Sequence, residues 1–346
     1  MHRRTFIQQT LTTAAGAALL PHWLYAAAGA KGDAVIIKTV QLLQWRKHLF
    51  VVVTDADGRK GMTLCNQRME YLSGIFNGLV APFFVDKDAR HITQLVDDVY
   101  KEERNYKLSG MPFWNCVGHV EVAVWDLLGK IQNKSVHQLL GKQFRTQLPM
   151  YLSSLTRDNA AEAEVEKLLA GLQATGCTAV KIKVGGRMET SSSAQKRSYD
   201  IVKLLRSKAP SSLTIYADAN SSFDVKEGIA MGKFLEAQGV DIFEEPCPWE
   251  DFESNRKVNE ALKKIKIAGG EQDTSFFRFS WYAHSNGLDV LQPDTFYNGG
   301  IIRTLRVADL CRQHKKFFAP HSPKADALEA PFLHLMAVAP AVYGFQ

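Results

Sequence analysis

The chain has 346 residues, of which 46% are hydrophobic and 23% charged, and its formal net charge is +6. This is an ordinary globular composition, and the length suits one large domain with a smaller one. Lysine and arginine are interspersed with acidic residues, which argues against a nucleic-acid partner and is compatible with a small anionic substrate.

The first 30 residues differ in kind from the rest. Arg3 and Arg4 precede an alanine-rich apolar run over residues 11–24, and an Ala-x-Ala site follows at residues 26–28. This is the layout of a signal peptide, and the paired arginines resemble a twin-arginine export signal. We therefore expect a periplasmic mature protein without a membrane span. The alternative, an uncleaved anchor, is disfavoured because the apolar run is short for a bilayer.

Residues 34–147 have a mixed pattern. Strand-like runs cover residues 35–43 and 48–54, and an Asp57-Gly58 turn follows the second run. Helical periodicity marks residues 92–102 and, more clearly, residues 116–132. We interpret this region as a small α+β domain.

After Pro149 short apolar strands alternate with amphipathic helices, the pattern of parallel β/α units over residues 149–346. Eight strands are predicted, and eight close a barrel. The helices between them are predicted at residues 160–174, 225–238, 251–264, 301–313 and 325–337. The strands are predicted at residues 150–153, 179–184, 213–220, 241–246, 266–271, 288–294, 317–321 and 341–346. An open doubly wound sheet is the rival, but the glycine-rich phosphate loop that it would need after its first strand is absent.

Polar residues gather where these strands end, which in a parallel barrel is where the chemistry lies. Lys181 and Lys183 are two residues apart and so point to the same side of their strand. A pair of solvated lysines is the simple alternative. Crowding of two ammonium groups in the barrel mouth should lower a lysine pKa, which suits a general base.

Three acids end the next three strands: Asp218, Glu244 and Glu271. Carboxylates from three successive strands would converge on one point, and such hard ligands suit Mg²⁺. Strand alternation favours Glu244 inside, with Glu245 toward the helix side or the adjacent loop. Asn220 shares the inward side of Asp218 and is a candidate to bind the ligand or substrate.

The sixth strand ends in Asp294 and the seventh in His321. An aspartate beside a histidine fixes its tautomer and raises its basicity. This pairing requires the barrel to place the sixth and seventh strands side by side.

Together these motifs resemble the mandelate racemase subgroup of the enolase superfamily, over essentially all of residues 34–346. The motifs are Lys181-Ile182-Lys183, Asp218-Ala219-Asn220, Glu244-Glu245-Pro246, Gly270-Glu271, Pro293-Asp294 with Tyr297-Asn298-Gly299-Gly300, and His321. The resemblance implies a modified (β/α)₇β barrel of the TIM type with an N-terminal α+β capping domain.

The resemblance also implies one Mg²⁺ per site, held by Asp218, Glu244 and Glu271. It implies Lys183 as the base on one face of a bound carboxylate, the His321–Asp294 dyad as the base on the other, and Lys181 near the carboxylate. The family usually continues past the last barrel strand, so we expect this chain to be truncated there. Gln346 then falls where a substrate-binding carboxylate is often found.

Removal of the proton α to a carboxylate is the expected first step, and dehydration of a sugar acid to a 2-keto-3-deoxy acid is the leading hypothesis. Racemisation or epimerisation of a 2-hydroxy acid uses the same residues, and a non-catalytic periplasmic sugar-acid-binding protein is the alternative from another class. The substrate would be read by capping loops at residues 43–50 and 66–77. An oligomer of identical chains is compatible with the sequence.

Overall fold

A computed structural model describes residues 32–322 and 329–346. The predicted signal peptide, residues 1–30, lies outside the described residues. So does the start of the helix predicted at residues 325–337. In the part of the chain that the structure describes, no helix is both long enough and apolar enough to cross a membrane.

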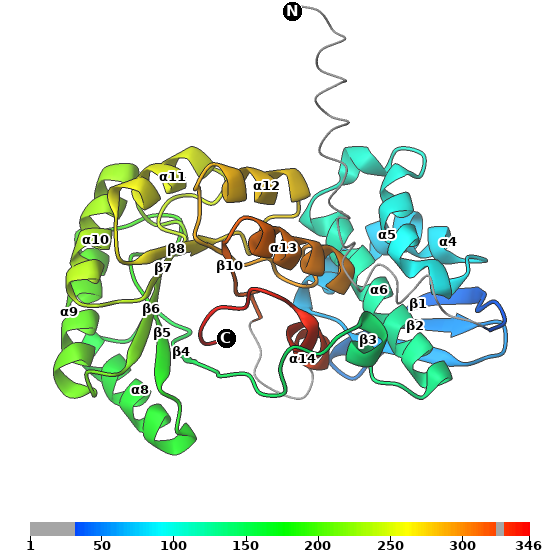
Figure 1. Ribbon diagram of the computed structural model, residues 1–346, viewed down its shortest axis with the longest axis horizontal. Helices are drawn as coiled ribbons and strands as arrows, with labels where there is room; N and C mark the ends of the chain where they lie inside the picture. Colours follow the sequence, from blue (N-terminus) through cyan, green and yellow to red (C-terminus); the bar gives the residue numbers. More distant parts are fainter. Residues whose placement is uncertain (1–31, 323–328) are drawn as a thin grey trace, which may run out of the picture.

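The N-terminal unit is a three-stranded antiparallel sheet covered by helices (Figure 1). The strands are β1 (Ile37–Trp45), β2 (His48–Asp55) and β3 (Lys60–Leu64), in that order. The long helix α6 (Met111–Gln132) packs on β2 and β3. Gly61 permits this approach, because a Cβ there would lie 2.1 Å from the carbonyl oxygen of Ala123. Strand β3 was not predicted.

Shorter helical segments complete this unit. In chain order they are η1 (Gln67–Tyr71), α3 (Ser73–Ile75), η2 (Phe76–Val80), α4 (Ala81–Phe84), η3 (Ala89–His91), α5 (Ile92–Lys101), η4 (Asn105–Leu108) and α7 (Val136–Leu140). Helix α5 was predicted almost to the residue, because its apolar side chains recur with helical periodicity.

The second unit is a curved parallel sheet surrounded by helices (Figure 1). Its seven strands follow one another in sequence order: β4 (Leu152–Ser153), β5 (Ala179–Lys183), β6 (Thr214–Asp218), β7 (Ile242–Glu244), β8 (Lys266–Gly269), β9 (Val290–Leu291) and β10 (Phe317–Phe318). The helices are α8 (Ala161–Thr175), α9 (Ser192–Lys208), α10 (Val225–Ala237), α11 (Phe252–Ala261), α12 (Phe276–His284), α13 (Ile301–Gln313) and α14 (Ala330–Val338). The predicted barrel with a capping domain is therefore confirmed, although α9 and α12 were not predicted.

The eighth predicted strand, residues 341–346, is wrong as a regular strand. Ala341 and Gly344 have φ values of 58° and 53°, which an extended strand does not allow. This segment nevertheless closes the barrel. Val342 bridges Phe318 of β10, and the backbone of Gln346 bonds on the β4 side to the carbonyl of Pro149 (2.9 Å) and the N–H of Tyr151 (3.1 Å).

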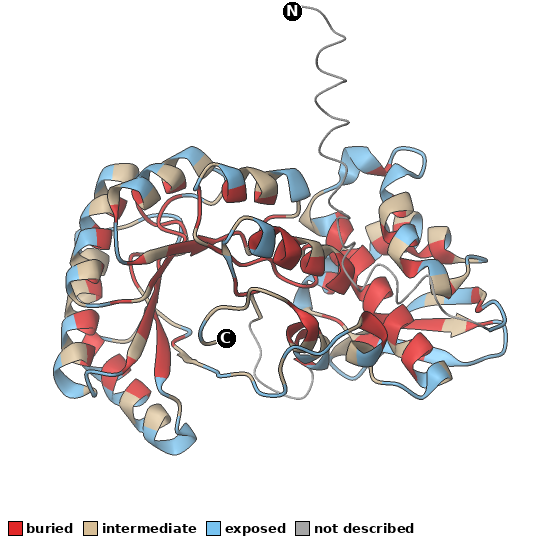
Figure 2. Ribbon diagram, viewed as in Figure 1, coloured by how far each residue is buried: buried red, intermediate tan, exposed pale blue. Residues whose placement is uncertain are grey.

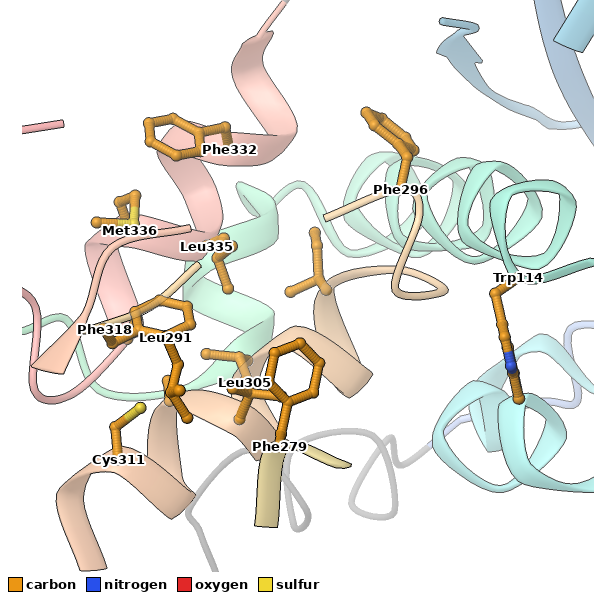
Figure 3. Packing of buried hydrophobic residues seen from close by; sticks show 14 of the residues in the cluster. Trp114, Phe279, Leu291, Phe296, Leu305, Cys311, Phe318, Phe332, Leu335 and Met336 are labelled. Atoms are coloured by element: carbon orange, nitrogen blue, oxygen red, sulfur yellow. The ribbon is translucent and has the colours of Figure 1, made fainter. Parts of the chain in front are cut away.

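Strand alternation divides the buried side chains into two sets. One small cluster fills the barrel interior: Tyr216, Ile242, Ala268, Val290 and Ala319. The side chains between them, such as Phe243 and Leu291, belong to the larger core outside the strands. Figure 2 shows the barrel strands β5 to β8 largely buried and the outer faces of the surrounding helices exposed. In Figure 3 that larger core joins α13, α14 and the strands beside them.

Candidate active site

The barrel interior positions the predicted acids by simple register. Asp218 pairs with Glu244 across β6 and β7, and each stands two residues beyond a member of the interior cluster. Both are about 1% exposed. The predicted alternation of strand β7 is confirmed, because Ile242 faces inward and Phe243 outward. Glu245 follows with a φ of 45° and is also buried, so the strand ends there.

The two lysines each meet a carboxylate. Lys181 Nζ lies 3.1 and 3.2 Å from the two carboxylate oxygens of Glu244. Lys183 Nζ donates to Oδ2 of Asp218 and, at 3.3 Å, to Oδ1 of Asn220. Asn220 thus lies beside Asp218, as its inward position predicted.

The expectation that crowding lowers a lysine pKa is wrong for Lys181. Burial alone would lower its pKa, but the Glu244 carboxylate, helped by Asp218, raises it well above the usual value. The effect of the buried carboxylates on the pKa of Lys181 therefore outweighs the effect of its burial. The pKa of Asp218 is lowered by the same ionic interactions. Burial alone would raise this pKa, but the positive charges of Lys183 and Lys181 lower it by more.

On the other side of the mouth, His321 lies between two carboxylates. Its Nδ1 lies 2.9 Å from Oδ2 of Asp294, and its Nε2 lies 3.3 Å from Oε2 of Glu271. The other oxygen of Asp294 accepts the backbone N–H groups of Phe296 (2.8 Å) and Tyr297 (2.9 Å). Asp294 is therefore held as an acceptor, so Nδ1 of His321 carries the proton.

The pKa of His321 reflects this surrounding charge. Burial lowers it, but Glu271 and the bond to Asp294 raise it, to about 9 overall. The pairing predicted from strands six and seven is thus present. The imidazole is turned toward Glu271 through Nε2, the nitrogen that would exchange a proton.

Two residues at this site were not identified from the sequence. Gln292, two residues before Asp294 on the inward side, donates through Nε2 to Oε2 of Glu244 at 3.0 Å. The ring of Tyr151 lies 5.3 Å from Nζ of Lys181. Strand alternation would have found Gln292, because it shares the inward side with Asp294.

The capping domain reaches the barrel mouth through one predicted loop residue. Arg68 donates through Nε to the hydroxyl of Tyr297 at 2.8 Å, and its guanidinium lies over that ring. Tyr297 lies in the turn that holds Asp294. By contrast, Trp45 is 60% exposed, with Arg46 stacked on it at the hairpin turn.

Gln346 lies in the barrel wall beside the residues that lead into β4. Its side chain donates to the carbonyl of Tyr343 at 2.6 Å, and its Oε1 has no hydrogen-bond partner among the described residues. Its backbone is bonded to Pro149 and Tyr151. These bonds join it to the wall and not to the lysines, the acids or His321.

The donor chemistry of the three carboxylates fits magnesium, although they are not gathered around one point. Among residues 32–322 and 329–346, no three His, Cys, Asp or Glu side chains are grouped so as to hold a metal as they stand. Each carboxylate is paired with a different basic side chain: Asp218 with Lys183, Glu244 with Lys181 and Glu271 with His321. The donor set still fits, because burial and repulsion from Glu244 and Asp218 raise the pKa of Glu271 despite His321. A divalent cation would relieve that repulsion.

Two family models match the chain. The N-terminal domain of mandelate racemase / muconate lactonizing enzyme matches residues 37–141, and the enolase C-terminal domain-like family matches residues 163–344. The chain belongs to the enolase superfamily. Within that superfamily, the N-terminal match places it in the mandelate racemase subgroup.

Named relatives are similar over most of this chain. It is 28% identical to D-galactarolactone cycloisomerase of Agrobacterium fabrum, over 80% of this chain and 71% of the relative. It is 25% identical to arabinonate dehydratase of Saccharolobus solfataricus, over 70% of this chain and 63% of the relative. The chain thus spans about two thirds of the length of these curated relatives.

Solved structures share the fold. A proposed racemase from Roseobacter denitrificans superposes with a TM-score of 0.84 at 28% identity, covering 90% of this chain and 84% of that one. A mandelate racemase/muconate lactonizing protein from Paracoccus denitrificans, solved in complex with magnesium, superposes with a TM-score of 0.79 at 24% identity. That match covers 90% of this chain and 85% of the other.

Proposed function

We propose that this chain is an Mg²⁺-dependent enzyme that removes the proton α to the carboxylate of a sugar acid and dehydrates it to a 2-keto-3-deoxy acid. The observation that carries the proposal is the arrangement of two bases around three carboxylates. Lys183 bonds to Asp218 on one side, and His321 bonds to Glu271 and Asp294 on the other. The dehydratase and cycloisomerase relatives support an acid-sugar substrate.

In this reaction Lys183 or His321 takes the α-proton, and the electrons of the broken C–H bond move onto the substrate carboxylate as an enolate. These electrons then form the double bond to Cβ as the Cβ–O bond breaks. Protonated His321 delivers its Nε2 proton to the departing hydroxyl, which leaves as water. The enol product then tautomerises to the ketone. Asp294 keeps the imidazole oriented throughout, because its second oxygen is anchored by two backbone N–H groups.

Asp218, Glu244 and Glu271 would hold the Mg²⁺, with Gln292 orienting Glu244. The ion would supply positive charge against the negative charge that develops on the substrate carboxylate. Lys181 supplies a second positive charge there. Asn220 lies beside Lys183, where its amide could accept a hydrogen bond from the substrate or donate one to it.

Racemisation or epimerisation is the second candidate, and the separation of the two bases favours it. Lys183 ends strand β5 and bonds to Asp218, whereas His321 follows strand β10 and bonds to Asp294 and Glu271. A proton removed by one base could then be replaced by the other. Both reactions share the first step and differ in the fate of the Cβ–O bond.

The experiment is a screen of acid sugars with the Mg²⁺-loaded protein in D₂O. Formation of 2-keto acid is scored by a carbonyl reagent, and deuterium at Cα is scored by NMR. Keto acid is the expected product. Deuterium exchange without keto acid would replace the dehydratase proposal by the racemase one. If no acid sugar in the panel gave either keto acid or deuterium exchange, both proposals would be wrong.

Single variants test the two bases. Lys183→Ala and His321→Asn should each abolish exchange at one face of Cα. Lys196→Ala and His91→Asn are matched controls, because Lys196 and His91 side chains are 79% and 65% exposed on the surface. Loss of activity in either control would point to a general effect of the substitution.

We also propose export of the folded enzyme through the twin-arginine route. The support is the sequence alone: Arg3 and Arg4 precede the apolar run of residues 11–24. Replacing both arginines by lysine should retain the full-length precursor in the cytoplasm, as followed by fractionation and immunoblotting. Unchanged appearance of the mature form in the periplasm would contradict the proposal.

A further inference from the structure

A large cavity lies between the capping domain and the barrel, apart from the residues described above. Its volume is about 820 Å³, within the usual range of small-molecule sites. Tyr100 and Trp114 line it from the capping domain, and Trp249 and Asp273 from the barrel loops. The residues that line it do not include Lys181, Lys183, His321 or any of the three predicted metal ligands.

Two residues that line this cavity, Asp273 and Gln272, each have a side-chain oxygen with no hydrogen-bond partner in the described part of the chain. Asp273 is 1% exposed, and its Oδ1 accepts the N–H of Ser275 at 3.0 Å, with Arg278 Nη1 at 3.5 Å. Its Oδ2, like Oε1 of Gln272, is buried and has no hydrogen-bond partner among the residues that the structure describes. Buried acceptors without donors are rare, and a ligand hydroxyl would satisfy them.

The cavity wall also contains groups that attract an anion. Helices α6 and α12 both begin at the cavity, and neither Gly110 nor Ser275 caps its helix with a side chain. Uncapped helix starts attract anions through their free N–H groups. Two cations add to this. Arg278 lines the cavity, and Arg303 donates to main-chain carbonyls rather than to a carboxylate.

Aromatic rings make up much of the remaining wall. Tyr100 stacks on Trp114, with ring centroids 5.7 Å apart. Trp249 lies beside Arg278, and Phe277 stands at the rim with 86% of its surface exposed. Flat apolar rings between charged groups suit the C–H faces of a small hydroxylated molecule better than a purely apolar ligand.

We propose that this cavity is a second small-molecule site, which binds a hydroxylated anion of monosaccharide size. The anionic group would lie at the helix starts near Arg278, and hydroxyl groups would donate to Asp273 and Gln272. Gln272 links this site to the first one, because its Nε2 donates to Oε1 of Glu271 at 3.0 Å. The inference does not depend on the reaction proposed above.

The test is calorimetric titration of the full, Mg²⁺-loaded chain with gluconate, glucose 6-phosphate, glucose and inorganic phosphate. At least one of the two hydroxylated anions should bind at least tenfold more tightly than glucose or phosphate, and the stronger of the two identifies the anionic group. Arg278→Ala should weaken that binding about tenfold. Ser275→Trp, which fills the cavity, should abolish it.

Phe277→Ala is the variant least able to disturb folding, because the ring is largely exposed, and it should weaken binding severalfold. Phe144→Ala, at a solvent-facing ring outside the cavity lining, is the matched control and should leave binding unchanged. Binding that is unaltered in both Ser275→Trp and Arg278→Ala, or no binding by any hydroxylated anion, would overturn the inference. Binding retained in Lys183→Ala separates this site from the proposed reaction.

Discussion

Replacement of Asp294 by asparagine should slow proton exchange on one face of the substrate and spare the other. One oxygen of Asp294 accepts two backbone N–H groups, so in the Asp294→Asn variant the amide oxygen must take that position. The amide nitrogen then faces Nδ1 of His321 as a donor, in place of the acceptor at 2.9 Å. Nδ1 of His321 must then accept this hydrogen bond, so the imidazole proton moves to Nε2. Nε2 is the nitrogen that has to be unprotonated for His321 to act as a base.

The loss is that of a charge-assisted hydrogen bond, about 1.5–3 kcal/mol, or roughly 10- to 150-fold in rate. Exchange at Cα in D₂O, followed by NMR for each α-epimer, should slow by this factor on the His321 face. Exchange on the Lys183 face should change by less than about threefold, since that base has separate partners. Equal slowing of both faces, or none on the His321 face, would refute the assigned role. Asp200→Asn, at a surface ion pair, is the control.

Three further predictions concern the surroundings of the site. Gln292→Leu removes the 3.0 Å bond to Glu244 and should raise the Mg²⁺ dissociation constant about tenfold, measured by metal titration of activity; an unchanged constant would contradict the positioning role. Burial raises the pKa of Glu121 to about 7. Its contribution to stability is therefore complete below its unfolded pKa and is lost as the pH rises through about 7. Relative to Glu121→Gln, the free energy of unfolding of the wild type, measured with urea, should fall by about 3 kcal/mol between about pH 4 and about pH 8. Parallel curves of stability against pH for the two proteins would contradict the raised pKa. Gly118→Ala places a Cβ 2.8 Å from the carbonyl oxygen of Phe296 and should lower the free energy of unfolding by about 1–3 kcal/mol. If the variant unfolded at the same urea concentration as the wild type, the backbone at Phe296 must be able to move away from the added methyl group.

The side-chain positions at the strand ends could be predicted because strand geometry is local. Once β6 and β7 are recognised, alternation alone places Asp218 and Glu244 inward, and sequential parallel strands bring them together. The same rule would have indicated Gln292. What alternation does not show is the bond that Gln292 makes, since that depends on the side-chain conformation of Glu244 across the barrel.

Other features depend on tertiary contacts that local patterns do not contain. Strand β3 is short and partly exposed, and it is stabilised by its contacts with β2 and α6. Helix α12 is rich in aromatic residues, which have a high strand propensity. The raised pKa of Lys181 is likewise non-local, because it comes from a carboxylate 63 residues further along the chain.

The capping domain also determines how Asp294 is held. The turn after Asp294 carries Phe296, whose ring stacks on His119 of α6 with centroids 4.2 Å apart. On the same helix, Glu121 accepts the N–H groups of Ile301 (2.9 Å) and Ile302 at the start of α13. Helix α6 thus contacts both ends of the loop that begins at Asp294. Because Asp294 orients the imidazole of His321, the base on that face is positioned by the capping domain as well as by the barrel. Substitutions in this part of α6 should therefore slow exchange on the His321 face more than exchange on the Lys183 face.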